Sequence, residues 1–163
     1  MAMAIEVGER IPSATLKRMT ADGPADISTD EIFAGKKVVL FALPGAFTPT
    51  CSAQHLPGFV ENASAIKAKG VDTVACLAVN DVFVMDAFGK GQNVGEEVVM
   101  LADGSGVFTK AVGLELDLVA MGLGVRSQRY AMIVEDGVVK SLAVEENPAG
   151  VEVSSAENVL ARL

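Results

Sequence analysis

The stretch Pro44-Gly45-Ala46-Phe47-Thr48-Pro49-Thr50-Cys51 joins a predicted strand to a predicted helix and places a cysteine at the junction. Residues 38–43 before it, Val-Val-Leu-Phe-Ala-Leu, are of the types that favour strands. Residues 59–69 after it have the composition of a helix, which Gly70 ends. Cys51 is therefore expected near the first turn of that helix. Free backbone N–H groups and the positive end of the helix dipole favour a thiolate over a thiol there.

The segments on either side of this junction predict an α/β fold. The sequence predicts strands at 14–19 (an edge strand), 72–79, 98–101, 125–134 and 138–144, and helices at 28–35, 82–89, 106–112, 114–121 and 155–163. Asp136-Gly137 predicts a hairpin between the last two strands. Strands that alternate with helices indicate a mixed central sheet flanked by helices. An active site is expected at the carboxyl edge of such a sheet, where Cys51 lies.

Composition narrows the classes of protein and of partner. The chain has 163 residues, which suits a single domain spanning 1–163. A net charge of -8 argues against a nucleic-acid or anionic-membrane partner. No apolar run approaches the roughly 20 residues that cross a bilayer, and the N-terminus lacks the pattern of a signal peptide. Two cysteines do not make a disulfide scaffold, so a cytoplasmic, reducing location is expected.

An isolated cysteine is more often a packing residue than a nucleophile, because free cysteine behaves as a small buried hydrophobe. Its neighbours reverse that expectation for Cys51. Pro44, Pro49 and Pro57 fix a loop that a core strand does not need. Thr48 stands three residues before the cysteine, where its hydroxyl can donate to a thiolate or to a bound oxygen.

The second cysteine, Cys76, lies inside the most apolar predicted strand, and a packing role is expected for it. It stands about four residues before the expected end of that strand, roughly 13 Å below the sheet edge at 3.3 Å per residue. A disulfide needs Cα atoms within about 7 Å. A bond between Cys51 and Cys76 would therefore require the start of the Cys51 helix to unravel.

Three further polar residues are candidates for the site. His55, the only histidine, follows Cys51 by four residues and could act as a general base, but Pro57 disturbs the helical spacing and favours a structural hydrogen bond instead. Arg126 and Arg129 are three residues apart on an otherwise apolar strand, so they are expected to face opposite sides. An inward arginine needs an anion such as a thiolate, and spacing alone does not say which of the two it is. One histidine and two separated cysteines offer no pattern for metal binding, and no cofactor motif appears.

The residues Pro44 to Phe59 resemble the active-site signature of the peroxiredoxins, and in particular of the peroxiredoxin-five subfamily with its plant type II members. Further similarity lies in Val74-Ala-Cys76-Leu-Ala-Val-Asn80-Asp81 and in Arg129-Tyr-Ala-Met132, so the resemblance covers nearly the whole chain. It implies a thioredoxin-like fold and the reduction of hydrogen peroxide and organic hydroperoxides.

The resemblance also assigns roles to single residues. Cys51 corresponds to the peroxidatic cysteine, which would become a sulfenic acid. Thr48 and Arg129 correspond to the groups that bind peroxide and hold the thiolate, and Pro44 to the proline that shields the pocket. Some members carry a resolving cysteine near the C-terminal end, but residues 148–155 contain none here. Cys76 is the other thiol that could resolve. Glutathione with glutaredoxin, or thioredoxin, is the expected reductant.

Two other functions stay open on the residues alone: a Cys-His thiol hydrolase and a non-catalytic thioredoxin-like binding module. A homodimer is also expected. Leu114, Leu118 and Met121 would form an apolar helical stripe, and Phe47 lies in the Cys51 loop.

Overall fold

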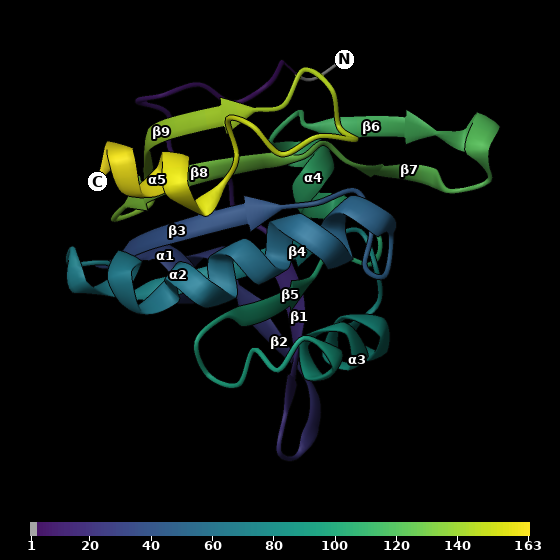
Figure 1. The fold of residues 1–163 in the computed structure, drawn as a ribbon, viewed down its shortest axis with the longest axis horizontal. Coiled ribbons are helices and arrows are strands. Elements are labelled where there is room, and N and C mark those ends of the chain that lie inside the picture. Colours follow the sequence, from purple (N-terminus) through teal and green to yellow (C-terminus); the bar gives the residue numbers. More distant parts are fainter. Residues whose placement is uncertain (1–2) are drawn as a thin grey trace.

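The computed structural model describes residues 3–163 and has a seven-stranded sheet at its centre (Figure 1). The strand order is β2-β1-β5-β4-β3-β8-β9. β3, β4 and β5 are parallel to their neighbours in this group, while the outer pairs are antiparallel. A separate two-stranded ribbon, β6-β7, projects from the body of the molecule (Figure 1). The mixed sheet and the helices on both of its faces confirm the predicted fold class.

The strands span the following residues: β1 Thr15–Thr20, β2 Gly23–Ser28, β3 Lys37–Ala42, β4 Thr73–Ala78, β5 Val99–Ala102, β6 Glu115–Leu118, β7 Gly124–Ser127, β8 Tyr130–Glu135 and β9 Val138–Val144. The helical elements are α1 Thr29–Phe33, the π-helical turn η1 Cys51–His55, α2 Leu56–Ala68, α3 Val82–Gly91, α4 Val107–Ala111, the 3₁₀ turn η2 Val119–Met121 and α5 Ala156–Arg162. None of the helices in the described residues is long and apolar enough to cross a bilayer.

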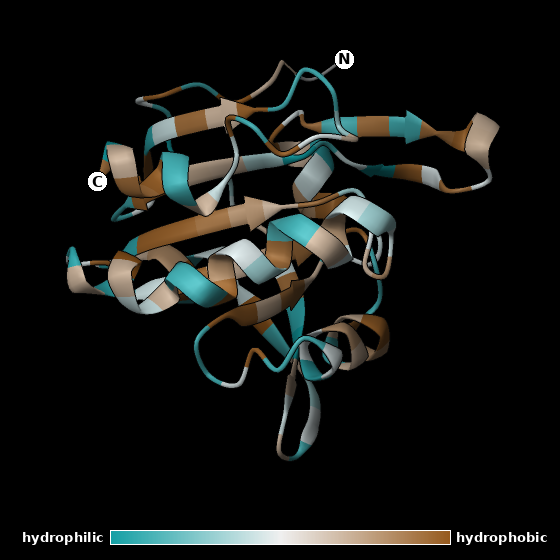
Figure 2. Ribbon diagram, viewed as in Figure 1, coloured by the Kyte–Doolittle hydropathy of each residue, from teal (hydrophilic) through white to brown (hydrophobic). Residues whose placement is uncertain are grey.

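The core has two halves, one on each face of the sheet. Alternation along β3 sends Val39 and Phe41 to one face and Val38 and Leu40 to the other. Helices α2, α3 and α5 cover the first face, and α1 and α4 cover the second. β3 and β4 are nearly unbroken apolar runs (Figure 2), and their burial on both faces of the sheet explains this composition. Cys51 and Cys76 belong to the core half beneath α2.

Several predicted boundaries are confirmed in detail. Ser28 caps α1 by accepting from the Glu31 N–H, as expected for a helix that starts at 28, and its hydroxyl donates to the Glu31 carboxylate. The hairpin between β8 and β9 turns at Asp136 and Gly137, whose φ angles are 46° and 77°. Ser155 caps the closing helix, α5.

Three predictions about elements are wrong. Residues 114–121 form β6 and η2 rather than a helix, because Glu115-Leu-Asp-Leu118 alternates with period two and pairs with β7. The stripe therefore does not exist: Leu114 is buried, whereas Met121 is 72% exposed. The predicted strand 125–134 is two strands, β7 and β8, with a break at Gln128 and Arg129.

The edge of the sheet also differs from the prediction. β1 is paired on both sides, with β2 and with β5, so β2 forms the edge. β2 is not among the predicted strands. Its residues, Gly-Pro-Ala-Asp-Ile-Ser, are exposed or partly buried, so it lacks the apolar signal that a core strand shows.

Candidate active site

Cys51 opens a π-helical turn that continues directly into α2. Within it the Leu56 N–H donates to the Cys51 carbonyl, one residue further back than in an α-helix. Pro57 explains the wider turn, because it has no N–H and its ring clashes with the carbonyl four residues earlier. The helical spacing after Cys51 is therefore disturbed, as predicted, although Leu56 itself keeps helical backbone angles, with φ -63° and ψ -47°. The Ser52 carbonyl, which Pro57 leaves free, accepts from Gln92 Nε2 at 3.1 Å.

Arg129 holds the Cys51 sulfur. Its Nη2 donates to Cys51 Sγ at 3.1 Å, and the two residues are 2% and 0% exposed. Its Nε donates to the Pro148 carbonyl at 2.9 Å and its Nη1 to His55 Nδ1 at 2.8 Å. Each of the three guanidinium nitrogens therefore has an acceptor, which fixes the orientation of the group. A buried cation at this place stabilises negative charge that develops beside the sulfur.

His55 lies in an aromatic pocket and serves as the acceptor for Arg129. Its ring centroid is 5.1 Å from that of Phe41 and 5.6 Å from that of Phe59. Its Nε2 lies 3.0 Å from the Ser154 carbonyl, which can only accept, so the proton is on Nε2 and the Nδ1 lone pair faces Arg129. Burial, and secondly the Arg129 charge, lower the pKa of His55 to about 3. The structural hydrogen bond predicted for His55 is present, and neither ring nitrogen is free to act as a base.

The loop before Cys51 is held by polar contacts from two other strands. Thr48 Oγ1 donates to the Gly45 carbonyl at 2.7 Å, so its proton is directed to the loop and its lone pairs remain available to accept. The Pro44 carbonyl accepts from Arg126 Nη1 at 3.3 Å. Asn80 Oδ1, at the end of β4, accepts from the Ala46 N–H at 2.9 Å. These contacts place Pro44, Thr48 and Cys51 in one loop-and-helix unit at the carboxyl ends of β3 and β4.

The two arginines do not divide into one inward and one outward residue. Arg126 lies on β7, half-buried, and its Nε donates to the Leu123 carbonyl at 2.7 Å. Arg129 lies in the break between β7 and β8, so the alternation of a single strand does not apply to the pair. Arg129 contacts the sulfur, while Arg126 contacts the loop that covers it.

Cys76 is buried within β4, opposite Phe41 of β3. β4 ends at Ala78, two residues later, so Cys76 is about 7 Å from the strand end rather than the predicted 13 Å. Burial, and secondly the charge of Cys51, raise the pKa of the Cys76 thiol, while Arg129 opposes this more weakly. Both cysteines are free thiols.

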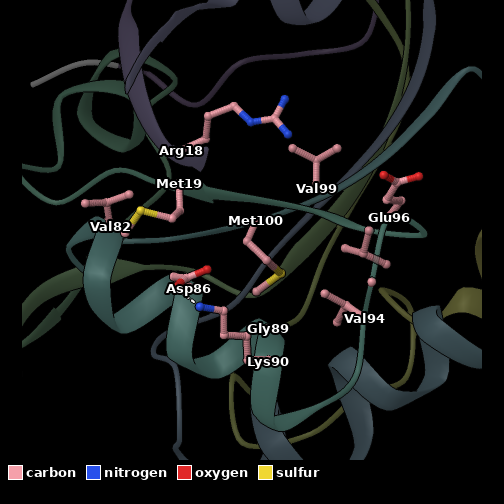
Figure 3. Close-up of a pocket in the computed structure, with 12 residues that line it drawn as sticks. Arg18, Met19, Val82, Asp86, Gly89, Lys90, Val94, Glu96, Val99 and Met100 are labelled. Carbon is pink, nitrogen blue, oxygen red and sulfur yellow. Dashed lines mark ion pairs between the residues drawn. The ribbon is translucent and has the colours of Figure 1, made fainter. Parts of the chain in front are cut away.

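A cavity of about 510 Å³ lies elsewhere, between β1, β5 and α3 (Figure 3). Arg18 and Met100 line it from the sheet, and the Asp86–Lys90 ion pair, at 2.9 Å, lines it from α3. None of the side chains that hydrogen-bond around Cys51 lines this cavity. Within residues 3–163, no group of three His, Cys, Asp or Glu side chains is placed to hold a metal ion.

Sequence reasoning missed the groups that orient the arginine. The carbonyls of Pro148 and Ser154 come from a segment almost 100 residues beyond the Cys51 loop, and a backbone carbonyl has no signature in a sequence. The contact of Asn80 with the Ala46 N–H was likewise not predicted, and the neighbouring Asp81 caps α3.

Comparison with known proteins agrees with this geometry. The Redoxin family model matches residues 6–160. Peroxiredoxin-2E, chloroplastic, from Arabidopsis thaliana is 48% identical over 98% of this chain and 70% of its own length. Peroxiredoxin-2B from the same plant is 47% identical over 98% of both chains. The crystal structure of reduced Prx3 from Vibrio vulnificus in complex with H₂O₂ is 55% identical, covers 97% of this chain and 98% of that one, and superposes with a TM-score of 0.92. The chain belongs to the redoxin family and, within it, is a peroxiredoxin, a thiol-dependent peroxidase.

Proposed function

We propose that Cys51 is the peroxidatic residue and that it reduces hydrogen peroxide and organic hydroperoxides. The observation that carries the proposal is the 3.1 Å contact between Arg129 Nη2 and Cys51 Sγ, with both residues buried. The sulfur lone pair attacks one peroxide oxygen and forms the S–O bond while the O–O bond breaks. The second oxygen leaves with the electron pair and takes a proton to become water or an alcohol. Sulfur is oxidised to the sulfenic acid, and the peroxide is reduced.

Arg129, Thr48 and Pro44 each have a different role in this step. Arg129 holds the thiolate and stabilises the negative charge that grows on the leaving oxygen. Thr48 presents hydroxyl lone pairs at the start of the helix and can accept a hydrogen bond from the protonated peroxide oxygen. Pro44 closes the pocket, and Arg126 holds its carbonyl in place.

An external thiol completes the cycle. A thiolate attacks the Cys51 sulfenic acid, forms a mixed disulfide and releases water, and a second thiol then releases Cys51. Cys76 is a poor candidate for the first attack because burial disfavours its thiolate. The Pro148–Ser155 segment contains no cysteine. Glutathione with glutaredoxin is the proposed reductant, with thioredoxin as the alternative.

The contacts of His55 do not support the hypothesis of a Cys-His thiol hydrolase. Its Nδ1 accepts from Arg129 and its Nε2 donates to Ser154, so it does not face Cys51 Sγ with a free lone pair. The lowered pKa of His55 also makes it a weak base at neutral pH.

We also propose a homodimer in the reduced state, through a surface that retains Phe47 and Met121 but not Leu114 or the helical stripe. Phe47, Val119, Met121 and Val125 are 58%, 61%, 72% and 49% exposed. Phe47 lies on the Cys51 loop and the other three on the β6–β7 ribbon, which meets that loop through Arg126. Apolar side chains gathered in this way often form an interface. Light scattering at micromolar concentration should give twice the 16.9 kDa chain mass, and Met121→Glu should shift it toward the monomer.

Two organisational predictions remain proposals. The span 1–163 is proposed as a single domain, supported by one sheet that uses strands from Thr15 to Val144. A reducing, cytoplasmic location is proposed from the two free thiols. Since the two Peroxiredoxin-2E relatives are named chloroplastic, fractionation of the source cells decides this point.

The test of the peroxidase proposal is consumption of hydrogen peroxide and of a small organic hydroperoxide with excess dithiol. The wild type should consume both, and Cys51→Ser neither. Mass spectrometry after one equivalent of peroxide should find one added oxygen on Cys51. Unchanged turnover in Cys51→Ser would refute the assignment. Repeating the assay with glutathione plus glutaredoxin, and with thioredoxin, identifies the reductant.

A further inference from the structure

We propose that Glu145 is a positioning residue of the peroxidase site: its buried carboxylate fixes the segment 147–154, whose carbonyls orient Arg129 and His55. This inference rests on the function proposed for Cys51 and Arg129. Glu145 follows β9 directly and looks like a surface residue in the sequence, beside Glu146.

The carboxylate of Glu145 is buried, and one of its oxygens accepts three hydrogen bonds. The residue is 6% exposed, and its Oε2 accepts from the Glu152 N–H at 2.8 Å, the Ser154 N–H at 2.7 Å and the Ser154 hydroxyl at 2.6 Å. Hydrogen bonds to an ionised acceptor are about twice as strong as neutral ones. One carboxylate oxygen therefore closes residues 145–154 into a compact loop.

Glu145 is also attached to the arginine directly. Its own N–H donates to the Arg129 carbonyl at 2.9 Å, where the pairing of β9 with β8 ends. Glu145 therefore hydrogen-bonds both to the main chain of Arg129 and to the loop that binds the Arg129 side chain.

The loop delivers three carbonyls around Cys51. The Pro148 carbonyl accepts from Arg129 Nε, the Ser154 carbonyl from His55 Nε2, and the Ala149 carbonyl from Thr50 Oγ1 at 2.8 Å. The Arg129 N–H at Nδ1 favours the same tautomer, so the Ser154 carbonyl and Arg129 together hold the His55 proton on Nε2. If the Ser154 carbonyl moved away, the proton could transfer to Nδ1, and an N–H would then face the Arg129 N–H. That arrangement is repulsive and would turn the guanidinium from the sulfur.

The chain offers a matched control. Glu145→Gln removes the charge at nearly constant volume, while Glu146→Gln makes the same change one residue away on an exposed side chain. Because His55 is the only histidine, an imidazole ¹⁵N spectrum reports its tautomer without assignment problems. Alkylation of Cys51 as a function of pH reports its thiolate, and thermal unfolding reports stability.

We expect Glu145→Gln, but not Glu146→Gln, to mix the two His55 tautomers and to slow peroxide reduction roughly 10- to 100-fold per folded molecule. Alkylation of Cys51 should require a higher pH than in the wild type. If Glu145→Gln unfolds, Ser154→Ala, which removes one of the three donors, is tested in its place with the same expectation at smaller size.

The proposal is overturned if the folded variant keeps the wild-type tautomer and alkylation profile and is only less stable, since Glu145 would then be structural alone. If the wild type reduces no peroxide, the proposed function fails, whereas the tautomer and alkylation measurements still decide the role of Glu145.

Discussion

The two cysteines are equally buried, at 0% exposed, and lie in the same half of the core, yet their surroundings differ. Cys51 lies at the start of a helical segment with a guanidinium nitrogen 3.1 Å from its sulfur. Cys76 lies mid-strand, and burial raises the pKa of its thiol. Burial alone therefore does not separate the thiol that we propose as peroxidatic from the other one. The buried cation with its own fixed partners does.

The largest expected effect comes from removing that cation, which makes Cys51 resemble Cys76. Arg129→Ala should lower the thiolate fraction of Cys51 and slow peroxide reduction roughly 100- to 1,000-fold. Arg126→Ala is the control, because it loses contacts to the Leu123 and Pro44 carbonyls but none to the sulfur. Its loss should stay within about tenfold, the size of one or two net hydrogen bonds. Stopped-flow kinetics measures both, and equal losses would refute the assignment of Arg129.

A direct comparison of the two thiols gives the next largest effect. Iodoacetamide at neutral pH should label Cys51 of the folded protein and leave Cys76 unlabelled, because the pKa of Cys76 is raised whereas a guanidinium nitrogen contacts the Cys51 sulfur. Mass spectrometry of the folded and the denatured protein locates the label. Denaturation should expose both thiols to labelling. Equal labelling of both in the folded state would erase the distinction drawn between them.

The third prediction concerns the acid stability of the Cys51 site. The pKa of His55 is about 3 in the folded protein, against an ordinary value of 6.5. The unfolded chain therefore binds a proton between these values that the folded chain does not. Neutral His55 therefore contributes to the free energy of unfolding. This contribution is complete above pH 6.5 and decreases as the pH falls toward 3, by about 1.4 kcal/mol per pH unit.

Denaturant unfolding at several pH values between 6.5 and 5 measures the slope of the free energy of unfolding against pH. Most carboxylates titrate below this range. His55→Asn removes the titrating group and should flatten the slope. Since the chain has one histidine, a slope that persists in this variant would show that another group causes it.

The smallest effect on activity is expected at Cys76. Cys76→Ser should keep most of its turnover with glutathione and glutaredoxin, because the proposed mechanism resolves Cys51 with an external thiol. It should lose about 1–3 kcal/mol of stability from the buried hydroxyl. Mass spectrometry of the wild type after one equivalent of peroxide is the companion measurement. A rapid internal Cys51–Cys76 disulfide, with turnover lost in the variant under both reductants, would make Cys76 the resolving residue.

The sequence by itself determined the parts of this protein that depend on neighbours along the chain. The apolar runs of β3 and β4, the Ser28 and Ser155 caps, the Asp136-Gly137 hairpin and the proline-rich loop that ends at Cys51 are local patterns of period, capping and turn chemistry. The same local reasoning was wrong for residues 114–121. Apolar residues there are four and seven positions apart, as on a helix, but residues 115–118 also alternate with a period of two and form β6.

Only the tertiary structure decided how the reactive sulfur is held. Spacing left Arg126 and Arg129 unresolved, and the break between β7 and β8 removed the alternation on which that reasoning depended. The groups that orient Arg129 are the His55 ring and the Pro148 carbonyl, and Glu145 fastens the loop that supplies that carbonyl. These residues come from three distant segments. Carbonyl oxygens and buried carboxylates become hydrogen-bond partners only when packing brings them together, so no pattern along the sequence predicts these contacts.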